Sequence, residues 1–392
     1  MQYRINPKNG DAISQLALGC MRLPRRGGRI NQEQTNALVA AAIENGINYF
    51  DTAYIYPGSE EALGKALAAV GKREDVKIAT KLPHFLCRKP EDLDRIFSTQ
   101  LARLQTDYID YYFIHMLGNV ESWERLKSYG IEEWIAQKRA DGKIRNLGFS
   151  FHGGKSQFLQ LLDVYDWDFC MVQYNYFDEN DQASASGVQA SYALGLPVFV
   201  MEPLRGGLLA DGLPKDAAAL FRAADKNRSP AEWALLWLLN QPEVTMALSG
   251  MSNLTQLAEN ARVADWASPN VLSESELAVY KSVVETLKRS IKVPCTACGY
   301  CVPCPVGVDI PSCFSAYNET YTSGLISGLG QYFQVTGMSA PVQSDASKCI
   351  GCKKCEEHCP QEIEIAKELV NVKRRMRIVK PIAGVMRKFM RI

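Results

Sequence analysis

Val76-Lys77-Ile78-Ala79-Thr80-Lys81 and Ile109-Asp110-Tyr111-Tyr112-Phe113-Ile114-His115 are two short apolar runs, and each ends in a nitrogen-bearing side chain. Runs of this length and composition are typical of buried strands. The segments between such runs space their apolar residues by three and four positions, which is the pattern of a helix face. Strands that alternate with helices imply crossover connections and a parallel sheet. Residues 76–115 are therefore predicted to form one strand–helix–strand unit.

The same alternation extends over about 250 residues and gives eight such units. Eight units in this length match a (β/α)8 barrel, whereas an open doubly wound sheet is the alternative. No Gly-x-Gly-x-x-Gly follows an early strand, which counts against a dinucleotide-binding open sheet. The fold class is therefore α/β, a TIM barrel. The predicted strands are Leu16–Cys20, Asn48–Thr52, Val76–Lys81, Ile109–His115, Ile144–Phe151, Phe169–Tyr174, Pro197–Met201 and Val244–Ser249.

Length and composition agree with a soluble chain of more than one domain. The 392 residues exceed the usual size of a single core, and 47% of them are hydrophobic and 22% charged. No run approaches the length of a membrane helix, and the first residues lack the apolar core of a secretory signal. We therefore expect a cytoplasmic location. The net charge is only +1, and no nucleic-acid partner is expected.

Four polar side chains follow three successive predicted strands, where a barrel carries its chemistry. Asp51 ends the second strand and Tyr56 lies five residues later, while Lys81 and His115 end the third and fourth. Singly, each has an ordinary structural explanation, such as a turn cap or a core histidine. Together they suggest acid catalysis: an ammonium is expected to lower the pKa of Tyr56, a carboxylate to fix that ammonium, and the imidazole to orient a carbonyl oxygen.

At these positions the sequence resembles the aldo/keto reductase superfamily. The resemblance covers about residues 1–265 and implies a barrel with nicotinamide chemistry, NADP(H) or NAD(H), at its mouth. It assigns Tyr56 as the general acid, Asp51 and Lys81 as groups that tune it, and His115 as the residue that positions the carbonyl. The motifs are Leu18-Gly19-Cys20-Met21-Arg22, Phe50-Asp51-Thr52-Ala53-x-x-Tyr56, Glu61-Ala62-Leu63-Gly64, Lys81, His115, Gly148-Phe149-Ser150, Gln173 and Glu259-Asn260.

The resemblance also implies a set of cofactor contacts. Ser150 and Gln173 match positions that hold the nicotinamide carboxamide, and residues 249–253 match the segment that binds the adenosine phosphate, before a helix N-terminus that suits an anion. The predicted cofactor-binding residues are Ser150, Gln173, Met201, Arg205, Gly250, Gln256 and Asn260.

Departures from the family pattern fall on this cofactor side. Phe151 stands where many members have Asn, and Met201 replaces an aromatic that stacks on nicotinamide. The phosphate segment contains no Lys or Arg, and its Gln256 has the spacing of a helix cap. Arg205 is a candidate replacement through the pyrophosphate. The choice between NADP, NAD and neither stays open.

The cysteines gather near the C-terminus, where nine of the twelve lie between residues 295 and 359. They form the runs Cys295-x2-Cys298-x2-Cys301-x2-Cys304-Pro305 and Cys349-x2-Cys352-x2-Cys355-x3-Cys359-Pro360. The second run has the bacterial ferredoxin spacing, in which the fourth cysteine binds the other cluster. Zinc is the alternative, but it gives no reason for the third cysteine of each run or for the prolines. We predict two [4Fe–4S] clusters.

Crossed ligation assigns the cysteines to two sets. One cluster takes Cys295, Cys298, Cys301 and Cys359, and the other takes Cys304, Cys349, Cys352 and Cys355. Because the first run is one residue short, Cys313 is an alternative to Cys304, and otherwise a small buried residue. The insert between the runs contains the helix start Asp309-Ile310-Pro311, which indicates a mainly helical ferredoxin-like module. A barrel with such a tail resembles the iron–sulfur branch of the aldo/keto reductases.

The predicted organisation is a barrel at residues 1–290, a cluster domain at 291–370 and a basic tail at 371–392. The tail carries eight Lys or Arg and no acid, with an apolar stripe after Pro381. It is expected to dock on the protein itself, or alternatively on an acidic electron-transfer protein or a membrane surface.

Three functions remain open at this point. The first is an oxidoreductase that reduces a small-molecule carbonyl with nicotinamide hydride and exchanges electrons with a ferredoxin- or flavodoxin-type protein through its clusters. The second is an electron-transfer or redox-sensing subunit whose barrel is a scaffold. The third is an ordinary NADPH carbonyl reductase with an inert cluster tail.

Overall fold

A computed structural model describes residues 1–152, 155–180, 182–295, 301–322, 324–336, 343–357, 359 and 363–377. These residues form two compact units. The first comprises Met1–Leu209 and Ala231–Glu274, and the second comprises Ala210–Pro230 and the chain from Ser275 onward. The predicted domain limits at residues 290 and 370 stay a prediction, and the tail helix after Pro381 lies outside the described residues.

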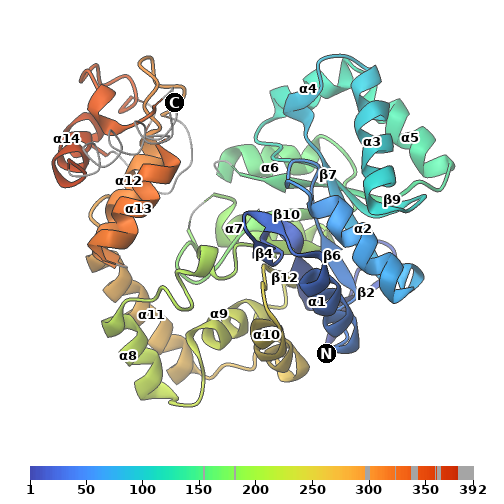
Figure 1. Ribbon diagram of the computed structural model, residues 1–392, viewed down its shortest axis with the longest axis horizontal. Helices are drawn as coiled ribbons and strands as arrows, with labels where there is room; N and C mark the ends of the chain where they lie inside the picture. Colours follow the sequence, from blue (N-terminus) through green and yellow to red (C-terminus); the bar gives the residue numbers. More distant parts are fainter. Residues whose placement is uncertain are drawn as a thin grey trace. The chain divides into compact units, whose positions relative to one another are not determined.

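The first unit is a closed barrel of eight parallel strands, which confirms the predicted fold class. Each strand pairs with the next along the chain, and the last pairs with the first. All eight predicted runs are strands, and the helices lie around the outside of the barrel (Figure 1). The strands are β3 (Leu16–Gly19), β6 (Tyr49–Asp51), β7 (Lys77–Leu82), β8 (Ile109–Ile114), β9 (Ile144–Phe151), β10 (Phe169–Gln173), β11 (Val198–Met201) and β12 (Val244–Ser249).

Helices fill the connections between strands, and two of them begin after an asparagine that caps the first turn. Asn31 accepts a hydrogen bond from the Gln34 amide, and Asn253 accepts one from the Gln256 amide. Each bond satisfies a backbone donor that the first helical turn leaves open. The helices are α1 (Gln32–Glu44), α2 (Ser59–Val70), α3 (Glu91–Leu104), α4 (Val120–Lys127), α5 (Ile131–Ala140), α6 (Lys155–Asp163), α7 (Ser184–Ala193), α9 (Pro230–Leu239) and α10 (Leu254–Trp266).

The interior of the barrel is filled with aromatic side chains. The rings of Phe169 and Phe199 stack with their centroids 5.1 Å apart, and those of Tyr49 and Tyr111 are 5.2 Å apart. A barrel filled in this way is a core and not a pore, so polar chemistry is confined to its ends.

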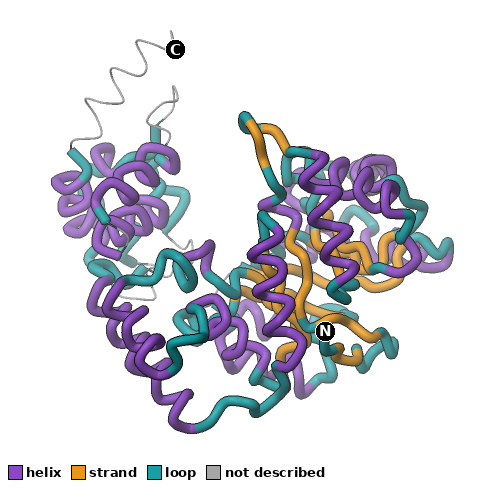
Figure 2. The backbone as a smooth tube through the Cα atoms, turned by 60° about the horizontal axis from the view of Figure 1, so that its bottom comes forward, coloured by secondary structure: helices purple, strands orange, loops and turns teal. Residues whose placement is uncertain are grey.

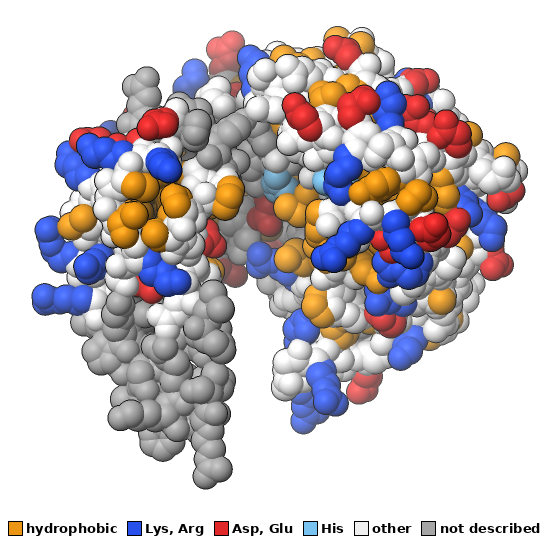
Figure 3. Space-filling view, turned by 90° about the horizontal axis from the view of Figure 1, so that it is seen from above, with side chains coloured by type: hydrophobic (Ala, Val, Ile, Leu, Met, Phe, Trp, Pro, Cys, Tyr) orange, Lys and Arg blue, Asp and Glu red, His pale blue; other side chains and the backbone are white. Residues whose placement is uncertain are grey.

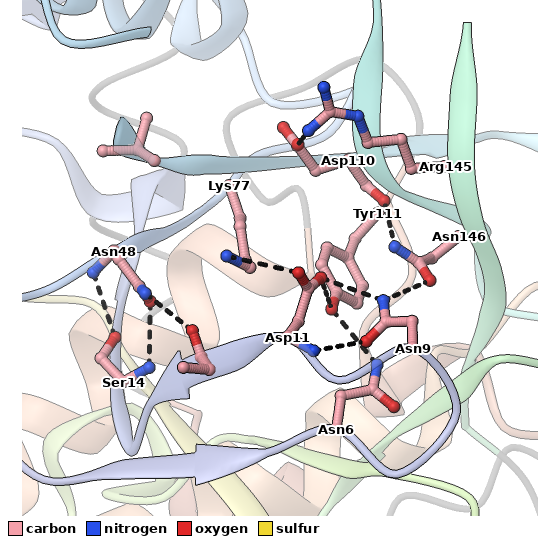
Figure 4. Close-up of polar contacts among 12 residues, drawn as sticks. Asn6, Asn9, Asp11, Ser14, Asn48, Lys77, Asp110, Tyr111, Arg145 and Asn146 are labelled. Atoms are coloured by element: carbon pink, nitrogen blue, oxygen red, sulfur yellow. Dashed lines mark hydrogen bonds and ion pairs between the residues drawn. The ribbon is translucent and has the colours of Figure 1, made fainter. Parts of the chain in front are cut away.

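The N-terminal end of the barrel is closed by a hairpin of β1 (Tyr3–Ile5) and β2 (Ala12–Ser14). Its loop bonds into the barrel: the Tyr111 hydroxyl donates to Asp11 Oδ2 at 2.7 Å, and the amide of Asn9 reaches Asn146 at 2.9 Å (Figure 4). A second hairpin, β4 (Arg25–Arg26) and β5 (Arg29–Ile30), follows β3 at the opposite end and stands out from the barrel (Figure 2). The carboxyl ends of the strands are therefore the open face.

The second unit is mainly helical, as predicted for the cluster module. Its core includes Phe314, Tyr332 and Leu369, and predicted cluster cysteines pack against it. At Gly328 a Cβ would lie 2.5 Å from the Thr320 amide nitrogen, so the two central helices approach at a glycine. The helices are α8 (Lys215–Ala224), α11 (Glu274–Ser290), α12 (Ile310–Thr322), α13 (Leu325–Val335) and α14 (Ile365–Arg375). Among the described residues no helix has both the length and the apolar character of a membrane span.

Candidate functional site

A buried ion pair connects the ends of β6 and β7. Lys81 Nζ lies 2.5 Å from Asp51 Oδ1 and donates to the Thr52 carbonyl at 2.8 Å, and both charged side chains are only 2% exposed. Burial lowers the pKa of Lys81, but the Asp51 carboxylate and the Tyr56 side chain outweigh it, so the net pKa lies above its usual value. Lys81 is therefore a fixed cation at neutral pH.

Tyr56 lies over this cation, with Lys81 Nζ 5.3 Å from the centre of its ring. The ammonium is the largest single influence on the pKa of Tyr56 and lowers it, whereas burial and the carboxylates of Asp51 and Glu202 raise it. The net pKa is raised. The prediction that Lys81 leaves Tyr56 with a lowered pKa is therefore wrong in its net direction, because the sequence does not show burial or the approach of Glu202.

His115 meets Tyr56 edge to face, with ring centroids 6.1 Å apart and planes at 85°. Burial, and next the Lys81 ammonium, lower the pKa of His115 to about 2, so the imidazole is neutral. Its buried Nδ1 has no hydrogen-bond partner among the described residues. Histidine side chains are visible at the surface of the barrel unit beside hydrophobic side chains (Figure 3). The four predicted catalytic residues thus lie together at one face.

Ser150 and Gln173, the predicted carboxamide contacts, lie at the carboxyl ends of two neighbouring strands: Ser150 is the next-to-last residue of β9, and Gln173 is the last residue of β10. Ser150 Oγ accepts a hydrogen bond from the Met116 amide at 2.9 Å, which leaves its hydroxyl hydrogen to donate elsewhere. Gln173 Nε2 donates to Asp178 Oδ2 at 3.0 Å, which leaves the amide oxygen to accept. One residue therefore offers a donor and the other an acceptor, which is the pair that a carboxamide needs.

Met201 is the last residue of the neighbouring strand, β11, and Arg205 lies in the loop that follows it. Arg205 Nε bonds to the same Asp178 oxygen at 3.1 Å, and its guanidinium lies 4.6 Å from the centre of the Phe177 ring. The charge of Arg205 is therefore already paired within the protein. Met201 is half-buried and is paired in register with Gln173, so a thioether lies beside the predicted carboxamide contacts.

Gly250, Gln256 and Asn260 surround the start of α10. Gln256 Oε1 accepts from the backbone and hydroxyl of Ser252 at 2.9 and 3.1 Å, as a helix cap does. Asn260 is buried and donates to Ser249 Oγ at 3.0 Å. These amides hold the loop after β12 in place, and direct contacts from them to a cofactor stay a prediction.

In the second unit a cavity of about 330 Å³ is lined by cysteines of both runs. Cys304 of the first run lines it together with Cys349, Cys352 and Cys355 of the second, and these are the four residues of one predicted crossed set. Cys301 lines it as well, and the Gly351 amide donates to Cys349 Sγ at 3.4 Å. The geometry therefore brings one run to the other as crossed ligation requires.

The structure describes three of the four cysteines in the other predicted ligand set. Cys295, Cys301 and Cys359 pack against the hydrophobic core, whereas Cys298 lies outside the described residues. Cys313 is fully buried, its thiol approaches the Ser344 carbonyl, and burial raises its pKa to about 12. Cys304 lines the cavity and Cys313 does not, so Cys304 stays the predicted ligand.

Three residues beside the barrel site are not among the catalytic or cofactor-binding residues predicted from the sequence. Asp178 joins Gln173 to Arg205, Glu202 acts on Tyr56, and Arg22 reaches the loop after β11 through Gly206. Arg22 lies in the motif Leu18-Gly19-Cys20-Met21-Arg22, and Glu202 lies in the segment Met201-Glu202-Pro203-Leu204-Arg205-Gly206-Gly207, which resembles the iron–sulfur branch of the family. Asp178 lies in a loop without a motif of its own.

Comparison with known proteins agrees with both units. The Aldo/keto reductase family matches residues 15–282, and a 4Fe-4S dicluster domain matches residues 294–364. L-galactose dehydrogenase of Arabidopsis thaliana is 24% identical over 74% of this chain and 96% of its own length, and methylglyoxal reductase YeaE of Escherichia coli is 29% identical over 64% and 86%.

Solved structures show the same barrel. The holo form of aldo-keto reductase AKR11C1 from Bacillus halodurans superimposes with a TM-score of 0.59 at 26% identity, covering 72% of this chain and 96% of that one. An aldo/keto reductase from Klebsiella pneumoniae in complex with NADP and acetate gives 0.58 at 25% identity, with the same coverage. The chain therefore belongs to the aldo/keto reductase family, and its barrel is followed by a 4Fe-4S dicluster domain.

Proposed function

We propose that this protein is a cytoplasmic oxidoreductase that reduces the carbonyl group of a small molecule at the mouth of its barrel. The observation that carries this proposal is the buried Asp51–Lys81 pair beneath Tyr56, with the neutral His115 ring against the same tyrosine. A buried pair of charges is costly to desolvate, and a phenol beside it has the geometry of a proton donor.

The hydrogen-bonding groups at the mouth fit a nicotinamide. The Ser150 hydroxyl is left to donate to a carboxamide oxygen and the Gln173 oxygen to accept from a carboxamide nitrogen, because their other atoms are engaged by Met116 and Asp178. A bound reduced nicotinamide, NADPH or NADH, supplies hydride there. Relatives solved with NADP and with NADPH support this cofactor.

The catalytic side chains divide the remaining work. His115, held neutral, donates one hydrogen bond to the substrate oxygen and fixes its orientation. Tyr56 transfers its hydroxyl proton to that oxygen as hydride reaches the carbon, so the carbonyl becomes an alcohol. Lys81 stabilises the phenolate that remains, and Asp51 holds Lys81 in place.

Two [4Fe–4S] clusters in the second unit complete the proposal. Cys304, Cys349, Cys352 and Cys355 surround one cavity, and no three Cys, His, Asp or Glu side chains among the described residues are grouped as ligands of a single ion. Five cysteines from two runs, Cys301 among them, line a space of about 330 Å³, which favours a cluster over zinc. Bound clusters would carry one electron at a time and would exchange it with a ferredoxin- or flavodoxin-type partner, separately from the two-electron hydride transfer to the carbonyl.

Tyr56→Phe in the full chain tests the enzymatic proposal. Loss of the proton donor is expected to lower kcat for carbonyl reduction by about 10²- to 10⁴-fold with the Kd for NADPH unchanged. Tyr54→Phe is the matched control, since the ring of Tyr54 lies under Arg103, 4.6 Å from its guanidinium and away from Lys81. Equal activity of the two variants would overturn Tyr56 as the acid.

The scaffold alternative draws on one observation. Met201 occupies the position beside Gln173 where the family resemblance leads us to expect an aromatic that stacks on nicotinamide. In that case Tyr56→Phe would leave electron transfer intact, and the wild-type protein would show no carbonyl reduction with any of a panel of aldehydes and ketones.

A separate variant tests whether the clusters take part. Cys352→Ser removes a ligand from one predicted set. If the carbonyl reduction by NADPH is unchanged and only electron exchange with a reduced ferredoxin is lost, the two activities are independent. If neither changes, the clusters are an inert tail and their part of the proposal fails.

A further inference from the structure

The family resemblance leads us to expect a basic residue that binds phosphate in the loop after β12, but the candidate cation, Arg22, lies in a different loop. Residues 249–256, after β12, contain no Lys or Arg, and the side chain of Gln256 is used as a cap on Ser252. Arg205 is paired with Asp178. A dinucleotide carries at least two negative phosphates, which proteins bind best with cations and backbone amides.

Arg22, at the end of the short 3-10 helix Cys20–Arg22 after β3, points into this region. Its guanidinium NH1 donates to the Gly206 carbonyl at 3.3 Å. A Cβ built on Gly206 would lie 3.2 Å from the other terminal nitrogen, and a Cβ built on Gly250 would lie 3.2 Å from Arg22 Cδ. The side chain therefore lies between the loops after β11 and β12, against a glycine in each.

Among the described residues Arg22 has no ion-pair partner within 4 Å, although the Glu202 carboxylate is nearby. Its guanidinium donates a hydrogen bond to the Gly206 carbonyl and forms no ion pair with a described carboxylate, and the side chain is exposed. Glu202 approaches the same glycine: the Cβ built on Gly206 would lie 3.8 Å from its Oε2. Arg22 thus has capacity for an external anion, because a guanidinium offers five donors in a planar fork.

We propose that Arg22 binds a phosphate group of the nicotinamide dinucleotide, in place of the basic residue that the loop after β12 lacks. This inference rests on the proposed function. Gly206 and Gly250 are the residue types that leave room for its side chain, and the bond to Gly206 fixes the direction of the fork. The phosphate belongs either to the pyrophosphate, common to both dinucleotides, or to the 2′-phosphate of NADP.

The test is a fluorescence titration of the anaerobically purified full chain with NADPH and with NADH, which reads binding without turnover. Arg22→Ala is expected to raise the Kd for NADPH by about ten- to a hundredfold, the usual worth of hydrogen bonds to a charged group. Arg22→Lys should recover part of this loss. An equal effect on NADH assigns the pyrophosphate, and an effect confined to NADPH assigns the 2′-phosphate.

Arg26→Ala is the matched control, because Arg26 is an exposed arginine of the nearby hairpin and the change in charge is the same. The slope of log Kd against log salt concentration should fall for Arg22→Ala and stay at the wild-type value for Arg26→Ala. The inference is overturned if Arg22→Ala binds NADPH as the wild type does, or if both alanine variants lose affinity equally. A wild-type protein that binds neither nucleotide would instead overturn the proposed function itself.

Discussion

Removing one charge from the Asp51–Lys81 pair should destabilise the barrel far more than removing an exposed charge. Two unit charges 2.5 Å apart attract by about 7 kcal/mol at an effective dielectric constant of about 20. Much of this attraction offsets the cost of burying both ions. In Asp51→Asn the Lys81 ammonium stays buried with only the Thr52 carbonyl and a neutral amide, and the expected loss is about 3–5 kcal/mol.

Anaerobic urea unfolding followed by tryptophan fluorescence measures this loss in the right unit, because all six tryptophans lie in the barrel unit. We expect the Asp51→Asn midpoint to fall by about 1 M or more. Lys77→Met is the control: Lys77 lies on β7, the strand that also contains Lys81, its 3.7 Å pair with Asp11 is partly exposed, and the loss of that pair should cost less than about 1 kcal/mol.

A double variant separates charge from packing. Asp51→Asn combined with Lys81→Met removes both charges and should recover most of the stability that the single change loses. If Asp51→Asn unfolds at the same urea concentration as Lys77→Met, or if the double variant is no more stable than the single one, the pair does not have the energetic role described.

Three further predictions concern pH and the clusters. The pKa of His115 is about 2 in the folded protein and near 6.5 in the unfolded chain, so between these pH values only the unfolded chain binds the proton. The contribution of His115 to stability is therefore complete above about pH 6.5 and falls by about 1.4 kcal/mol per pH unit below it. His115→Gln lacks this dependence, so the urea midpoint of the wild type should fall relative to that of His115→Gln between pH 7.5 and pH 5. Parallel curves would contradict this. Glu202→Gln should move the alkaline limb of kcat to lower pH, because the Glu202 carboxylate raises the pKa of Tyr56; a pH–rate profile with an unmoved limb excludes that influence. Cys352→Ser should reduce bound iron from about eight atoms per chain to about four, while Cys313→Ser retains about eight, as counted by iron and sulfide analysis; iron loss from Cys313→Ser would make it a ligand.

The strands of the barrel could be predicted because each is a local pattern. Ile109–Ile114 is apolar except for Asp110, and every residue of the strand is buried, so the run of residues itself indicates a strand that is covered on both faces. The convergence of Asp51, Lys81 and His115 followed from the same pattern, because the carboxyl ends of neighbouring parallel strands meet at one face.

The electrostatics of the site could not be predicted in the same way. The pKa of Tyr56 depends on how deeply the ring is buried and on Glu202, which is distant along the chain. Asp178 joins Gln173 to Arg205 through contacts that no spacing of residues encodes. Such effects depend on distance and solvent exclusion, which exist only after the chain has folded.

Local patterns in the sequence predict the eight strands and the two cysteine runs and suggest Asp51, Tyr56, Lys81 and His115 as catalytic residues, because periodicity and metal-ligand spacing act over a few residues. Only the tertiary structure decided that Cys304 shares a cavity with the second run while Cys313 is buried in the core, and that Arg22 lies between Gly206 and Gly250. The physical reason is that ligation and ion pairing depend on distances in space, which closing the barrel and packing the helices fix between residues far apart in the chain.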